Sequence, residues 1–220
     1  MCDWSGVEYT PNKNGQLTGN ICYSDVKSMI IKRLKPVVKL RSHVCRLIWC
    51  GVLFVLSLSA SAYDFGSGDI KVPEGFEGPV MKAPSEAFSA VGFTRRHDDS
   101  DKSTLLQLTL FTPPDGIPEL NQARQIAFSK QYLMQFLEGV KRRRDNFSTS
   151  AIETVSIDGV PAVRIRWTGR STENNVELYG EMYCMIYQQQ LLSFHVQDFT
   201  DLDSAGYEAA RSAVMAIAFD

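Results

Sequence analysis

Cysteine and histidine are scarce in this chain of 220 residues, which has five cysteines and three histidines. Four of the cysteines precede residue 60, and Cys184 follows it alone. A domain formed after residue 60 therefore has no internal disulfide and depends on a hydrophobic core for its stability. Cys184 lies in an apolar, strand-like segment without basic neighbours, which predicts a buried and unreactive thiol.

Motifs for catalysis, metal binding and nucleotide binding are also missing. The sequence has no Gly-x-Ser-x-Gly nucleophile elbow and no glycine-rich phosphate loop. His97 and His195 are the histidines after residue 62, and neither has a His or Cys at the spacing of metal ligands. His195 and Asp198 lie three residues apart, so a regular strand places them on opposite faces. We therefore expect no catalytic residue, no metal and no cofactor.

Long apolar runs are limited to one, Leu47–Leu58, which follows a basic stretch from Lys32 to Arg46. The small residues Ala60-Ser61-Ala62 close it and fit a cleavage site. A membrane span needs roughly 20 apolar residues, and this run is about a dozen long. We therefore predict a signal peptide over residues 29–62 and a periplasmic or secreted protein. An uncleaved membrane anchor is the alternative.

Residues 1–28 are polar and lack a pattern, although a signal peptide should begin close to its basic stretch. Our hypothesis is that translation starts at Met29 and that residues 1–28 are a disordered gene-start extension. Eight of the 23 basic and three of the 25 acidic residues precede Tyr63, which leaves 15 basic and 22 acidic residues, a net charge of −7. This balance argues against nucleic acid or an anionic membrane as the main partner. Membrane association is expected only if the signal segment stays uncleaved.

Residues 63–220 are predicted to form a single α+β domain, an antiparallel sheet covered by helices. Alternation of Leu106, Leu108 and Leu110 with polar residues is typical of a half-buried strand, and Asp158-Gly159 indicates a tight hairpin. The predicted strands cover residues 69–72, 88–96, 104–112, 148–157, 160–168, 176–188 and 191–199. The predicted helices cover about 118–145 and 204–219.

An aromatic ridge, formed by Phe128, Tyr132 and Phe136 at four-residue spacing, accompanies the apolar stripe of the first predicted helix. Apolar stripes on helices usually pack inward, which predicts a wide buried face. The alternative is a docking surface for a partner or a second subunit. The oligomeric state is left open by the sequence.

Polar side chains are assigned to faces of the sheet by alternation along the strands. Arg164 and Arg166 lie opposite the apolar positions of their strand, and Glu181 and Tyr183 share one face of the next strand. His195 lies opposite the apolar positions of the last strand. If these faces coincide, the five residues form one polar cluster, the most site-like feature of the sequence. The alternative is a solvated or helix-covered face on which Arg–Glu pairs join the strands.

The order of the predicted elements resembles the PsbP-like family, and three short motifs add to the resemblance. They are Val72-Pro73-Glu74-Gly75-Phe76, Ile157-Asp158-Gly159-Val160-Pro161-Ala162 and the tyrosine-rich strand that ends at Tyr187. The family includes a photosystem extrinsic subunit, a small Ran-binding protein and bacterial exported proteins without an assigned role. The resemblance covers most of residues 69–220 and implies an α/β/α sandwich used for binding or assembly without catalysis. It transfers no functional residues, because no diagnostic site motif is present.

We therefore predict an exported, non-enzymatic protein that binds a protein partner in the cell envelope or supports envelope assembly. The polar cluster of Arg164, Arg166, Glu181, Tyr183 and His195 and the aromatic ridge are its two candidate surfaces. The alternative is a small-ligand binder, or an enzyme of unrecognised type, that uses the polar sheet face as its pocket. A deep cavity lined by the cluster would favour this alternative, and a flat face would count against it.

Overall fold

The computed structural model describes residues 8–11, 17–20, 61–82, 87–97 and 100–220. The hypothesis of a start at Met29 and nearly all of the predicted signal peptide lie outside these residues. Within residues 1–28, strands β1 (Glu8–Pro11) and β2 (Leu17–Asn20) pair as an antiparallel two-stranded ribbon. This ribbon differs from the predicted disorder of the segment, whose polar sequence carries little of the apolar periodicity that indicates a strand.

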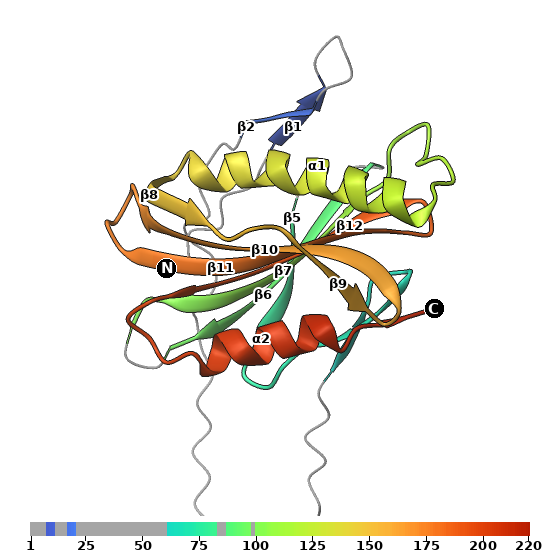
Figure 1. Ribbon diagram of the computed structural model, residues 1–220. Helices are drawn as coiled ribbons and strands as arrows, with labels where there is room; N and C mark the ends of the chain where they lie inside the picture. The colour runs from blue at the N-terminus through green and yellow to red at the C-terminus, as the bar shows by residue number, and fades with distance from the viewer. Residues whose placement is uncertain (1–7, 12–16, 21–60, 83–86, 98–99) are drawn as a thin grey trace, which may run out of the picture. The chain divides into compact units, whose positions relative to one another are not determined.

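An eight-stranded antiparallel sheet forms the middle layer of the domain, with strand order β5-β6-β7-β12-β11-β10-β8 and β9 paired with the first half of β10 (Figure 1). Its strands are β5 (Glu77–Lys82), β6 (Phe88–Arg96), β7 (Ser103–Phe111), β8 (Arg144–Thr149), β9 (Glu153–Ile157), β10 (Val160–Ser171), β11 (Glu177–Tyr187) and β12 (Gln190–Phe199). A separate three-stranded sheet contains β3 (Ala62–Asp64), β4 (Gly68–Lys71) and β13 (Ala218–Phe219).

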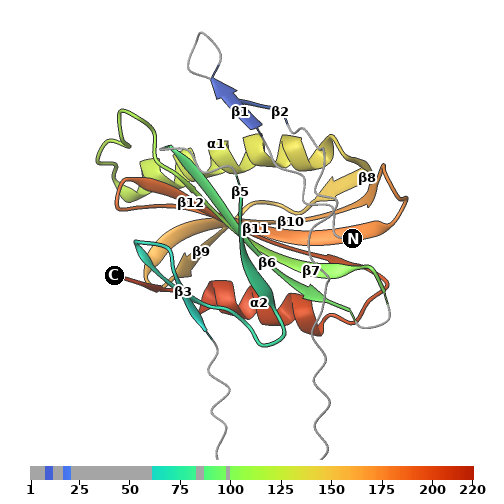
Figure 2. The ribbon, with the colours of Figure 1, turned by 180° about the vertical axis from the view of Figure 1, so that it is seen from behind.

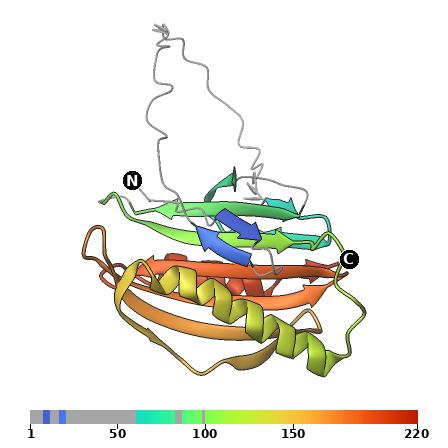
Figure 3. The same ribbon diagram turned by 90° about the horizontal axis from the view of Figure 1, so that it is seen from above.

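Two helices cover opposite faces of the large sheet (Figures 1 and 2). Helix α1 (Gln122–Lys141) is capped by Asn121, whose side chain accepts a hydrogen bond from the backbone N–H of Arg124 at 3.0 Å. It packs over β10 and β11, as the view from above shows (Figure 3). Helix α2 (Ala205–Met215) packs over β12 and β7 on the other side. The layers are therefore helix, sheet and helix, as in an α/β/α sandwich.

Each face of the sheet has its own hydrophobic core. Leu133 of α1 packs with Ile165 and Trp167 of β10 on one face, and Val214 of α2 packs with Phe194 of β12 on the other. The indole of Trp167 lies against the backbone of β11, where a Cβ on Gly180 would come within 2.6 Å of the ring. Gly180 therefore allows the largest buried side chain to lie close against the neighbouring strand.

The predicted α+β class, with an antiparallel sheet between helices, is confirmed. The prediction of one strand over residues 148–157 was wrong, because β8 ends at Thr149 and β9 begins at Glu153. Strands β3 and β5 were not predicted, since glycine and proline interrupt the hydrophobic alternation in residues 63–84. Among the described residues, no helix is both long and apolar enough to span a membrane.

Candidate functional site

A polar network occupies the face of β10 and β11 that looks toward the α2 side of the sheet. The antiparallel register places Arg164 opposite Tyr183 and Arg166 opposite Glu181. Because residues directly opposite in an antiparallel pair point to the same face, these four side chains meet. Glu153 of β9 joins them, since β9 pairs with the other edge of β10 opposite Arg164. We call these five residues the polar network.

Glu181 is the centre of this network, and its side chain is fully buried. Its carboxylate accepts a hydrogen bond from Arg166 Nε at 3.0 Å and one from the Tyr183 hydroxyl at 2.7 Å. Arg164 Nη1 lies 3.5 Å from the same carboxylate, and Arg164 Nη2 donates to Glu153. Two guanidinium groups and one hydroxyl therefore satisfy a single buried charge, which burial requires.

The pKa values of the network favour fixed protonation states. Burial and the adjacent Glu181 carboxylate raise the pKa of the Tyr183 hydroxyl, so it stays protonated and donates. The hydrogen bond from Arg164 lowers the pKa of Glu153. Burial alone would lower the pKa of Arg164, but its partners Glu153 and Glu181 outweigh burial and raise it. Tyr183 and Arg164 are therefore poorly suited to exchange a proton near neutral pH.

The network reaches solvent through Arg166 and Glu153, whose side chains are 54% and 45% exposed, whereas that of Arg164 is 15% exposed. On the α2 side, Arg211 lies nearby: its pKa is raised first by its hydrogen bond to Glu208 and further by the charge of Glu181. The Arg166 guanidinium is therefore exposed to solvent, and the buried Glu181 carboxylate fixes its orientation. Such a group recognises carboxylates and phosphates.

His195 does not join the other four residues of the predicted cluster. It lies opposite Met182 in β11, so its side chain points to the α1 face, away from Glu181 and Tyr183. Its ring packs between Trp167 and Phe136, at centroid distances of 5.7 and 5.9 Å. The prediction of a five-residue cluster was therefore wrong for His195, because the β11–β12 register turns its face of the strand to the opposite core.

The surroundings of His195 keep its imidazole neutral. Burial, and secondarily the positive charge of Arg144, lower the pKa of His195 to about 3. The Arg144 guanidinium stacks 4.5 Å from the Trp167 ring centre and donates to the Val140 carbonyl at 2.9 Å and to Gln197 at 2.6 Å. Arg144 therefore closes the C-terminal end of α1, and His195 acts as a buried aromatic side chain.

The aromatic ridge is divided between core and surface. Tyr132 and Phe136 are buried, at 7% and 8% exposure, and Tyr132 stacks on Phe111 of β7. Phe128 is 39% exposed. The prediction of a buried face is confirmed for Tyr132 and Phe136, and a docking surface made of all three rings is excluded by their burial. Cys184 is likewise buried, and burial raises the pKa of its thiol.

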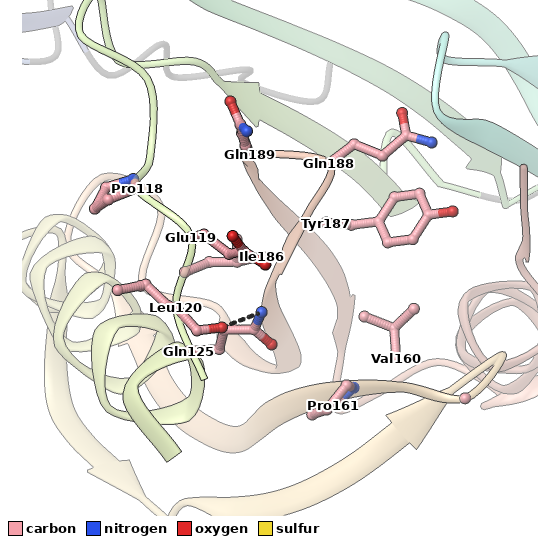
Figure 4. A pocket seen from close by; sticks show the side chains of 11 residues that line it. Pro118, Glu119, Leu120, Gln125, Val160, Pro161, Ile186, Tyr187, Gln188 and Gln189 are labelled. Carbon is pink, nitrogen blue, oxygen red and sulfur yellow. Dashed lines mark hydrogen bonds between the residues drawn. The ribbon is translucent and has the colours of Figure 1, made fainter. Parts of the chain in front are cut away.

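A pocket of about 450 Å³ lies at one end of the sheet, between the start of α1 and the β9–β10 and β11–β12 turns (Figure 4). Glu119, Gln188 and Gln189 contribute polar groups, and the Gln125 side-chain amide donates to the Leu120 carbonyl at 3.0 Å. None of the residues of the polar network lines this pocket. The polar face is therefore not the wall of this cavity.

A second buried polar group, which sequence reasoning missed, links β7, β12 and the loop that follows β6. The Thr104 hydroxyl donates to Asp198 Oδ2 at 2.8 Å, and His97 Nε2 lies 3.1 Å from the same hydroxyl. Burial raises the pKa of Asp198. Thr104 is fully buried, so a substrate does not reach its hydroxyl. Pairing of three strand ends assembles this group, and no local motif signals it.

No three His, Cys, Asp or Glu side chains are grouped as metal ligands in the part of the chain that the structure describes. No protein-family model matches the chain, and no curated protein matches it.

Solved structures do resemble the chain. Cyanobacterial PsbP (CyanoP) from Synechocystis is 15% identical, with a TM-score of 0.52, over 79% of this chain and 99% of that protein. LpqN, involved in cell envelope biogenesis of Mycobacterium tuberculosis, is 14% identical over 71% and 89%, with a TM-score of 0.45. A Pseudomonas aeruginosa protein of unknown function, a putative regulator by its description, is 13% identical over 70% and 92%, with a TM-score of 0.42. The match to CyanoP establishes that the chain has a PsbP-like fold.

Proposed function

We propose that this protein is exported and binds a protein partner of the cell envelope, without catalysis, through its polar network. The observation that carries the proposal is the half-exposed guanidinium of Arg166, held by a fully buried carboxylate at 3.0 Å. A preoriented guanidinium loses little conformational freedom on binding and makes two parallel hydrogen bonds to a carboxylate. The partner chemistry that fits best is therefore an acidic side chain on a protein surface.

The protonation states of the buried groups support binding over catalysis. A general acid or base works best with a pKa near the operating pH. The pKa of Tyr183 is raised by burial, and that of His195 is lowered to about 3. The Cys184 thiol has a raised pKa because it is buried, and so has the Asp198 carboxyl. Apart from Asp198, these shifts move the groups away from the range that proton transfer or nucleophilic attack at neutral pH requires.

Export is supported by the order of basic, apolar and small residues ahead of Tyr63. We expect the protein recovered from the envelope or the medium to begin at Tyr63. Mass spectrometry of that protein tests the proposal. A recovered protein that still contains residues 29–62 would indicate an anchor, and any peptide from residues 1–28 would contradict a start at Met29.

The binding surface is tested by capture of partners from an envelope extract with Arg166→Gln. Arg170 provides a matched control, because it lies four residues along the same strand, is 41% exposed and pairs with Glu177. We expect Arg166→Gln to lose the partner and Arg170→Gln to retain it. Equal capture by both variants, with unchanged thermal unfolding, would contradict a role of the polar network.

The alternative function is a small-ligand binder or an enzyme that uses the polar face as its pocket. The pocket of about 450 Å³ is not lined by Arg164, Arg166 or Glu181, so it does not favour a ligand-binding or catalytic role of the polar face. The same variants separate the two functions, because a soluble ligand would bind without an envelope protein. Turnover that Arg166→Gln abolishes would establish the alternative.

A further inference from the structure

Charge is distributed very unevenly over the domain, which the net value of −7 conceals. Residues 122–144, which contain α1 and the turn that follows it, have six basic residues and one acidic residue, Glu138. The six are Arg124, Lys130, Lys141, Arg142, Arg143 and Arg144. The rest of residues 63–220 has nine basic and 21 acidic residues. Residues 122–144 thus carry a net charge of +5 on a domain whose remainder carries −12, and α1 itself carries +2.

The outward side of α1 combines this charge with exposed apolar groups. Phe128 is 39% exposed and Met134 is 48% exposed, two of the five large hydrophobic side chains that are exposed in the described structure. At 100° per residue, Lys130, Met134 and Lys141 fall within about 40° of one another around the helix axis. Arg124 and Phe128 lie about 80° and about 120° beyond Met134, with exposed Glu138 between them and Met134, so the basic and apolar groups span about 160° of the helix. Arg124, Phe128, Lys130, Met134 and Lys141 are all exposed. We call Arg124, Phe128, Lys130, Met134 and Lys141 the α1 surface.

Neighbouring carboxylates reduce this charge without reversing it. Asp145 lies in β8, four residues after the last residue of α1. Glu173 is close enough to raise the pKa of Arg144, against the larger effect of burial, which lowers it. Subtracting both leaves a net charge of about +3. The carboxylates around α2, such as Asp203 and Glu208, lie beyond the sheet. Layers about 10 Å thick put them on the order of 20 Å away, further than the Debye length of about 8 Å.

We propose that the α1 surface docks on an anionic lipid surface. A helix that lies flat in a membrane interface combines basic side chains, which contact lipid phosphates, with apolar side chains, which enter the headgroup region. Each lysine or arginine near such a surface adds about fivefold to partitioning. A lipid surface also accepts Phe128 and Met134 without a complementary cavity, whereas an acidic protein would have to provide one. The proposal differs from the expectation from net charge that an anionic membrane is not the main partner.

This contact uses the face of the sheet opposite to the polar network and is independent of the proposed protein partner. Figure 1 shows α1 and α2 on opposite sides of the sheet. Arg166→Gln should therefore leave the lipid contact intact, and changes in the α1 surface should leave protein capture intact. Failure of one proposal can thus be told apart from failure of the other.

Site-specific photocrosslinking in the processed protein, which begins at Tyr63, tests the proposal. The photoreactive residue p-benzoylphenylalanine replaces Phe128, and Lys71, exposed in β4, is replaced as the matched control. Vesicles contain phosphatidylglycerol with phosphatidylcholine, or phosphatidylcholine alone. Because this protein lacks residues 1–62, neither position is brought to the vesicle by the apolar signal segment, which would otherwise end next to Lys71.

We expect position 128 to give at least about tenfold more lipid adduct than position 71 on the anionic vesicles, and little on the neutral ones. Lys130→Glu with Lys141→Glu should reduce the adduct at least about tenfold, while Arg96→Glu should leave it within about twofold. Circular dichroism confirms that the variants fold. Equal adducts at both positions, or an adduct at position 128 that ignores lipid charge or the lysine reversals, would overturn the proposal. So would an adduct at position 128 in envelope fractions that consists of protein and contains no lipid.

Discussion

Replacement of Glu181 by alanine is the most informative perturbation of the polar network. Removing one partner of a buried ion pair costs about 3–5 kcal/mol when the remaining charge stays buried. Here Arg166 is 54% exposed and can be solvated, and Arg164 keeps Glu153, so the lower end of that range applies. We therefore expect Glu181→Ala to lower the free energy of unfolding by about 3 kcal/mol. Glu181→Gln should cost about 1–2 kcal/mol and Tyr183→Phe about 1 kcal/mol.

Urea unfolding followed by circular dichroism measures these differences. For a domain of this length, 3 kcal/mol corresponds to a fall of about 6–12 °C in Tm. The double variant Glu181→Ala, Tyr183→Phe should be less destabilised than the sum of the single variants, because each single variant already removes the same 2.7 Å hydrogen bond. Glu181→Ala within about 0.5 kcal/mol of the wild type would refute the reasoning, since a carboxylate that can be deleted at so little cost does not orient Arg166.

Two further predictions concern the core on the α1 face. Because the folded-state pKa of His195 is lowered to about 3 by burial and by Arg144, the unfolded chain binds more protons below the ordinary value near 6.5. The free energy of unfolding should therefore fall by up to about 1.4 kcal/mol per pH unit from about pH 6 to about pH 4. His195→Gln should remove this contribution. Equal dependence of the free energy of unfolding on pH in both proteins would contradict a buried, neutral imidazole. Gly180→Ala places a Cβ within 2.6 Å of the Trp167 ring and should cost about 1–3 kcal/mol in urea unfolding, whereas an unchanged midpoint would mean that the indole lies elsewhere.

Much of the polar network could be predicted because it depends on alternation within two strands. Arg164 and Arg166 lie opposite the apolar residues of β10, and Glu181 and Tyr183 share a face of β11. A short loop joins these strands, and Ile165 and Met182 are buried on the same face. The register of β10 against β11 must therefore put the polar side chains of both strands together on the other face. Glu153 was not predicted to belong to the network. The break between β8 and β9, which lets β9 pair with β10 opposite Arg164, has no signal in the sequence.

His195 could not be placed because its face depends on the length of one turn. Tyr187 pairs with Gln190 across the two-residue turn Gln188-Gln189, and this register puts His195 opposite Met182. A turn one residue longer would put His195 opposite Tyr183, on the polar face. Both turn residues have positive φ, 45° and 61°, where glycine or asparagine is usual, so glutamines gave no signal for so tight a turn.

The aromatic ridge shows a similar limit for helices. Spacing of four residues aligns Phe128, Tyr132 and Phe136 on one side of α1, but it does not tell how far the sheet extends beneath them. Tyr132 meets Phe111 of β7 and Phe136 meets His195 of β12. Phe128 lies nearer the start of the helix and is partly exposed. Tertiary contacts therefore divide a ridge that is uniform in sequence.

The affinity of the captured envelope partner for Arg166 variants tests the central claim most directly. Calorimetric titration of the purified partner into wild-type protein, Arg166→Gln and Arg170→Gln gives a Kd for each. Loss of a charge-assisted, bidentate contact should weaken binding by at least about tenfold in Arg166→Gln. Arg170→Gln should bind as the wild type does. A Kd that is the same for all three proteins would contradict binding through the polar network.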